Sequence, residues 1–164
     1  MGNMKNLKKG QFYIFVAILL SAISFSMLKG STVLAKPHSF EDIRANYIQE
    51  SEFVLNNAIY QEQNPFEQFD HFTKNFQKFA REKNINFEVV YMLLYQDTIK
   101  IVNYLSVPVT VNITGTEEKL FPNEGTFIDK VAALKISFEG LENTYKFAPD
   151  EPVQLKLLII TEER

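Results

Sequence analysis

The sequence predicts an α+β fold, in which amphipathic helices come first and an antiparallel β-sheet or a small sandwich of two sheets follows. Two observations support this prediction. Residues 39–83 repeat apolar side chains every three or four positions, which is the period of an α-helix. From Ile85 onward the chain changes to short β-branched and aromatic runs separated by turn residues, as strands do. Helices followed by consecutive strands indicate α+β topology, with the helices packed on one face or end of a sheet.

Composition places limits on the classes of function. The chain has 164 residues, 46% of them hydrophobic and 23% charged, which suits one globular domain and excludes a disordered or collagen-like chain. The formal net charge of -3 argues against a nucleic-acid binder, which usually carries a basic surplus. The chain contains no cysteine, so disulfides, zinc ribbons and thiol chemistry are excluded. Every acidic residue lies at Glu41 or later, whereas the first 35 residues hold four lysines.

An uncharged apolar run extends from Gln11 to Leu28 behind the basic leader of residues 1–10. As a helix with a rise of about 1.5 Å per residue this run is roughly 27 Å long, close to the hydrocarbon thickness of a bilayer. We therefore expect residues 11–29 to form a transmembrane helix in the lipid bilayer or the hydrophobic part of a signal peptide. Three lysines precede the run and Lys29 follows it. This distribution predicts a single-pass membrane protein with a cytoplasmic amino terminus and its carboxy-terminal domain outside.

The leader leaves two processing routes open. Small residues before and at Ala35 match the cleavage site of a secretory signal peptide, so a peptidase could cut after Ala35 and release the rest of the chain. Whichever route is used, we expect residues 30–37 to form a linker and residues 38–164 to form the extracytoplasmic α+β domain.

The sequence KKGQ at residues 8–11, followed at once by the apolar run, supports the second route. It resembles the class III, type IV pilin-like signal peptide of archaeal surface proteins, over residues 8–28 only. The resemblance implies cleavage between Gly10 and Gln11, with the apolar segment kept as a membrane anchor or filament core. Pilins that assemble usually carry a glutamate at the fifth position after cleavage, where this chain has Phe15. The resemblance thus implies a pilin-like anchor and gives less support to filament assembly.

Capping residues predict where the two helices begin. Ser39 can cap the first helix, and Asn64 can cap the second, whose first position is Pro65. The second helix ends near residues 83–84 and carries a phenylalanine stripe at spacings of three and four residues. The stripe consists of Phe66, Phe69, Phe72, Phe76 and Phe79. Core packing against the sheet is the first interpretation, and a contact face for a partner protein, a second copy or the bilayer is the alternative.

The strands follow at residues 85–95, 98–105, 107–113, 118–121, 126–128, 132–138, 143–147 and 153–161. The run 107–113 alternates apolar and polar residues, which predicts a half-buried strand. Because proline has no N–H group to donate, Pro108 predicts an edge position for this strand.

A search for catalytic and binding motifs finds none. The sequence contains no phosphate-binding glycine loop, no GxSxG elbow, no HExxH and no calcium loop. Glu67 and His71 share a helix face but provide two of the three or four ligands that a metal site needs, and His38 lies in the linker. We therefore expect no catalytic, cofactor or metal site, and an enzyme with an unrecognised site is the least favoured hypothesis.

Asn112, Ile113 and Thr114 match the N-glycosylation acceptor beside a turn, so Asn112 is a candidate for modification on an outside domain. Taken together, the sequence predicts a membrane-anchored extracytoplasmic protein with a structural or interaction role, including that of a pilin-like surface subunit. The alternative is a secreted ligand- or peptide-binding module released by cleavage after Ala35.

Overall fold

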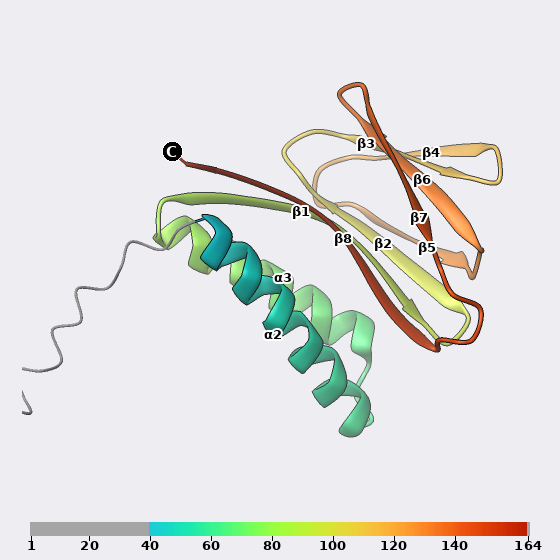
Figure 1. Ribbon diagram of the computed structural model, residues 1–164, viewed down its shortest axis with the longest axis horizontal. Coiled ribbons are helices and arrows are strands. Elements are labelled where there is room, and N and C mark those ends of the chain that lie inside the picture. The colour runs from blue at the N-terminus through green and yellow to red at the C-terminus, as the bar shows by residue number, and fades with distance from the viewer. Residues whose placement is uncertain (1–39, 164) are drawn as a thin grey trace, which may run out of the picture. The chain divides into compact units, whose positions relative to one another are not determined.

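The computed structural model describes residues 40–163 (Figure 1). The expected leader, apolar run and linker lie outside the described residues, and so do Gly10, Gln11, Ala35 and the predicted cap Ser39. Among residues 40–163, no helix is both long enough and apolar enough to cross a membrane.

The two expected helices are present as α2 (Phe40–Tyr60) and α3 (Pro65–Glu82). The predicted cap of α3 is confirmed: the Asn64 side chain accepts hydrogen bonds from the backbone N–H groups of Phe66 and Glu67, at 3.0 and 3.4 Å. The helices pack on each other, and a buried hydrogen bond of 2.8 Å between the Tyr47 and Thr73 hydroxyl groups joins them.

The strands form two four-stranded antiparallel sheets, which confirms the α+β class and the sandwich alternative. Sheet A has the order β5 (Gly125–Asp129), β2 (Thr98–Tyr104), β1 (Ile85–Tyr95), β8 (Val153–Glu163). Sheet B has the order β4 (Thr116–Leu120), β3 (Val109–Ile113), β6 (Ala133–Phe138), β7 (Leu141–Lys146).

Sheet A is the middle layer, with the two helices against one face and sheet B against the other (Figure 1). Strand β1 shows why. Every side chain from Val89 to Leu94 is fully buried. Val89, Tyr91 and Leu93 belong to the helix-side core, and the residues between them belong to the core that sheet B covers. A strand buried on both faces reads as a continuous apolar run instead of an alternation.

The edge position predicted from Pro108 is wrong. Strand β3 lies inside sheet B, between β4 and β6. It begins at Val109, so Pro108 precedes the ladder and its missing N–H group costs no interstrand hydrogen bond. The predicted alternation is confirmed, because Val109 and Val111 are buried and Ile113 packs on the same core.

The phenylalanine stripe of α3 faces sheet A. Phe69 and Phe76 are buried in the helix-side core, Phe66 and Phe72 pack against it, and Phe79 is 38% exposed. Core packing therefore accounts for four of the five side chains.

Candidate functional site

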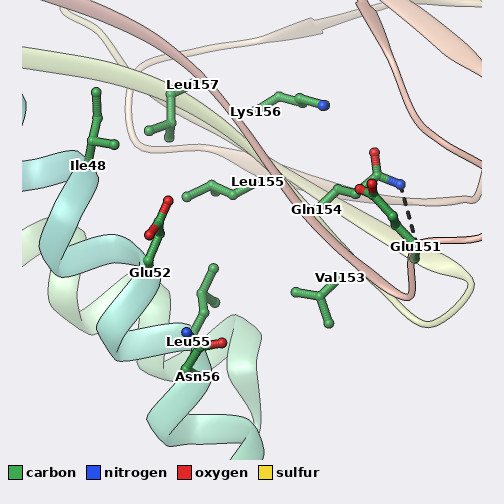
Figure 2. A pocket seen from close by; sticks show the side chains of 10 residues that line it. All are labelled: Ile48, Glu52, Leu55, Asn56, Glu151, Val153, Gln154, Leu155, Lys156 and Leu157. Atoms are coloured by element: carbon green, nitrogen blue, oxygen red, sulfur yellow. Dashed lines mark hydrogen bonds between the residues drawn. The ribbon is translucent and has the colours of Figure 1, made fainter.

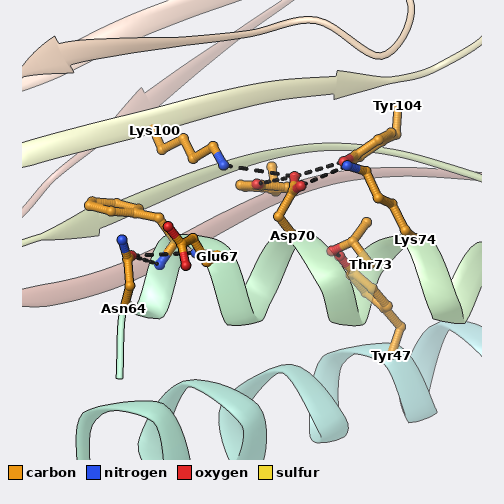
Figure 3. Close-up of polar contacts among 10 residues, drawn as sticks. Tyr47, Asn64, Glu67, Asp70, Thr73, Lys74, Lys100 and Tyr104 are labelled. Carbon is orange, nitrogen blue, oxygen red and sulfur yellow. Dashed lines mark hydrogen bonds and ion pairs between the residues drawn. The ribbon is translucent and has the colours of Figure 1, made fainter. Parts of the chain in front are cut away.

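The described part of the chain has two candidate sites, a polar cluster and a surface groove. The first is a polar cluster between α3 and sheet A, centred on Asp70 (Figure 3). Its Oδ1 atom accepts hydrogen bonds from the hydroxyl groups of Tyr104 at 2.7 Å and Tyr91 at 3.0 Å. Its Oδ2 atom accepts from Lys74 Nζ at 2.8 Å, and Lys100 Nζ lies 3.8 Å from Oδ1. One carboxylate thus joins α3 to both β1 and β2.

The surroundings of Asp70 keep it charged. Partial burial favours its neutral form, but the hydrogen bonds from Lys74 and Tyr104 and the charge of Lys100 outweigh burial and lower its pKa. Burial raises the pKa of Tyr91 and of Tyr104, and the neighbouring carboxylate raises both further. At neutral pH the cluster therefore holds one carboxylate and two neutral phenols that donate to it. Because its donors come from both α3 and sheet A, this carboxylate helps to fix the helix on the sheet.

The second place is a groove of about 430 Å³ between α2 and β8 (Figure 2). It arises because α2 packs closely on α3 and covers β8 only partly. Val89, Tyr91 and Leu93 of β1, which face the helices, are fully buried, whereas the side chains of β8 that face the same way are only partly buried. The groove is lined by Ile48, Glu52, Leu55 and Asn56 of α2 and by residues 153–157 of β8, including Gln154 and Lys156, with Glu151 at one end.

The groove walls are mixed: apolar side chains of α2 and β8 alternate with polar and charged residues, two of which are carboxylates. Ile48 is 40% exposed, and Figure 2 shows the Glu52 side chain between α2 and β8, near Leu155. Glu52 and Glu151 make no ion pair with any described residue. The loop at the end of the groove is fixed by Gln154, which exchanges hydrogen bonds of 2.9 and 2.7 Å with the backbone N–H and C=O groups of Ala148.

Strand β8 also has an open edge. Its eleven residues pair with β1 along their whole length, and no strand in residues 40–163 pairs with its other side. The other three outer strands of the two sheets have five or six residues each, and β4 and β7 carry several charges. Strand β8 carries Lys156 near its start and Glu162 and Glu163 at its end, and residues 157–161 between them are uncharged. Natural sheets usually protect their edges with short, charged or covered strands, so β8 is the exception in this domain.

The residues singled out from the sequence lie elsewhere. Glu67 and His71 are exposed on α3, and the described chain contains no group of three or more acidic or histidine side chains that could hold a metal ion. His38 lies outside the described residues. Asn112 is half-buried at the end of β3, where its Oδ1 atom accepts a hydrogen bond of 3.1 Å from the Gly115 N–H. Its glycosylation stays a prediction.

Sequence reasoning did not find the groove or the Asp70 cluster. The signal for the groove was the last strand, which is long and mainly apolar up to Thr161. The Asp70 cluster had a weaker signal in the i, i+4 pair of Asp70 and Lys74, because its tyrosines lie 21 and 34 residues further along the chain.

Comparisons with protein-family models, with curated proteins and with solved structures found no match to this chain.

Proposed function

We propose that this chain is a membrane-anchored extracytoplasmic protein whose folded domain is an interaction module. Two features support the proposal. The uncharged run after the basic leader is long enough to hold the chain in a bilayer. The observation that carries the interaction role is β8, a long outer strand with a mainly apolar sequence up to Thr161, whose unpaired edge lies beside a groove.

An open edge of this kind carries a cost for the domain. Unpaired backbone N–H and C=O groups on an apolar strand are a template for another chain, which makes them an aggregation hazard. The domain avoids this hazard at β4 and β7 with short, charged strands. A long and mainly apolar edge retained in the same domain is best explained by a partner that pairs with it.

The pilin-like leader supports an anchor cut after Gly10, and a pilin-like surface subunit is the finer form of this proposal. The second candidate is a secreted peptide-binding module released after Ala35. The small residues at that site favour it, and it would use the same groove.

The mature amino terminus tests the anchor. Cells that express the full chain are separated into membrane and soluble fractions, and the amino terminus of the protein in each fraction is determined by mass spectrometry. A protein that begins at Gln11 or Met1 and stays in the membrane fraction is the expected result. A soluble protein that begins at Lys36 would overturn the anchor and favour the released module.

A further inference from the structure

We propose that the free edge of β8 binds an extended peptide segment with alternating apolar and basic side chains, supplied by a partner protein. The segment adds as a fifth strand to sheet A and places every second side chain in the groove beside α2. This inference rests on the interaction role proposed above and adds the chemistry of the partner.

The backbone of β8 provides the first argument. A strand added to an edge lies about 4.8 Å from its neighbour and gains affinity from main-chain hydrogen bonds. The eleven residues of β8 exceed the length of an average strand, so a partner segment of ordinary length can pair fully. Because side chains alternate along a strand, every second residue of the partner would face α2.

The side chains of the groove provide the second argument. Ile48 and Leu55 offer apolar contact to the added strand, and Glu52 lies between them on the same face of α2. The one basic residue among the groove residues does not neutralise this carboxylate. Lys156 pairs with Met92, whose side chain belongs to the core between the two sheets, so Lys156 lies on the other face of sheet A. Figure 2 likewise shows Lys156 pointing away from Glu52.

Charge complementarity therefore selects the partner. Glu52 and Glu151 give the groove two carboxylates without an ion-pair partner in the described chain, and a lysine or arginine of the added strand would supply one. A second copy of this chain fits less well. Pairing of β8 with β8 of another copy would bring the same carboxylates of both copies to one face of the joined sheet, with no basic group added.

Fluorescent peptides test the proposal with the full chain in a nonionic detergent. The first peptide alternates valine and lysine, and the second alternates valine and glutamate. A third has the sequence of the first, but its backbone nitrogens are methylated at alternate positions, on the edge that would pair. We expect fluorescence anisotropy to show binding of the first peptide alone. Glu52→Gln should weaken that binding by up to about fivefold, the effect of removing one exposed charge pair.

Glu50→Gln is the matched control, because Glu50 lies on the same helix, is exposed and does not line the groove. An equal loss in Glu50→Gln and Glu52→Gln would overturn the basic partner. Equal binding of the lysine and glutamate peptides, blocked by methylation, would also overturn it but would leave the interaction role intact. Binding of no peptide by a protein that stays monomeric in analytical ultracentrifugation would overturn both, whereas dimers that exclude the peptides would identify a second copy as the occupant.

Discussion

The face of sheet A that packs on the helices and the face that packs on sheet B are filled by different side chains. On the helix side, Tyr47 lies among phenylalanine rings, with ring centroids 4.9 Å from Phe76 and 4.8 Å from Phe87. The Asp70 cluster lies at the margin of the same layer. On the other side, valine, leucine, isoleucine and methionine form most of the core.

The difference shows how each layer is held in place. Hydrogen bonds to Asp70 are directional, so they specify where α3 sits on the sheet as well as adding stability. The Gln77 side chain adds to this by donating to the backbone carbonyls of Phe87 and Tyr104, both at 3.2 Å. Between the sheets, close packing of branched side chains fixes the arrangement with few polar contacts. Substitutions on each face of sheet A can test whether the two faces differ in this way.

The largest effect is expected from the two neighbouring leucines of β1, which are of the same type, equally buried and on opposite faces. Leu93→Ala opens a cavity on the helix side and Leu94→Ala opens one between the sheets. Each should lower the free energy of unfolding by about 2–5 kcal/mol. Urea denaturation, followed by circular dichroism and tyrosine fluorescence, measures both.

Because β1 belongs to both cores, we expect each leucine variant to unfold in a single transition that both probes report. A Leu93→Ala protein that loses its helices in a separate, earlier transition would show that the two faces are not one cooperative unit.

The next largest effect is expected from Asn103, a buried polar side chain on the side of sheet A that sheet B covers. Its amide donates to the carbonyls of Val107 at 2.9 Å and Leu120 at 3.1 Å, and its Oδ1 atom accepts from the Leu105 N–H at 2.9 Å. Asn103→Ala leaves three backbone groups without these partners and should cost about 2–4 kcal/mol in urea denaturation. Asn143→Ala, at an exposed position of the edge strand β7, is the control and should change stability by less than about 0.5 kcal/mol.

Local signals in the sequence predicted the elements better than their arrangement. Asn64 and Pro65 marked the start of α3, because capping depends on neighbours along the chain. The edge position predicted from Pro108 was wrong, because a missing N–H group matters only inside a strand ladder and β3 begins one residue later. The continuous apolar run of β1 was compatible with burial on both faces, but a run of this kind does not say which layers cover it.

The Asp70 cluster required information that no local pattern holds. Tyr91 and Tyr104 meet at one carboxylate because Val89 pairs with Tyr104 and Tyr91 with Val102, which places both tyrosines on the same face of adjacent strands. That register follows from the tight turn between β1 and β2. The position of Asp70 over these strands then depends on how α3 packs, which is a tertiary property.

The third prediction concerns the negative charge of Asp70, at the centre of the polar cluster on the helix side. Asp70→Asn keeps the size of the side chain but loses the charge-assisted hydrogen bonds, and it should lower stability at pH 7 by about 1–3 kcal/mol. Asp150→Asn, in the exposed loop before β8, is the control and should have little effect.

The pH dependence of this difference follows from the pKa of Asp70, which is lower in the folded protein than its ordinary value of 3.8. Folding therefore gains from the ionised form above that value, and the gain is lost as the pH falls through the folded-state pKa. The stability difference between the native protein and Asp70→Asn should be constant from about pH 5 to 7 and should shrink below about pH 4. A difference that grows on acidification would contradict the direction of the shift.

The smallest effect is expected from Lys74, although it makes one of the shortest contacts with Asp70, at 2.8 Å. Its side chain is 56% exposed, so water screens the pair, and alanine is at least as good a helix former as lysine. Lys74→Ala should therefore cost at most about 1 kcal/mol in urea denaturation, with exposed Lys78→Ala as the control. Tyr104→Phe, which removes a more deeply placed donor at 2.7 Å, should cost more, about 1.5–3 kcal/mol. If Lys74→Ala lowered the free energy of unfolding more than Tyr104→Phe does, the surface ion pair and not the tyrosine hydroxyl would hold α3 on the sheet. The contrast between the two faces of sheet A would then depend on charge at the margin of the helix layer.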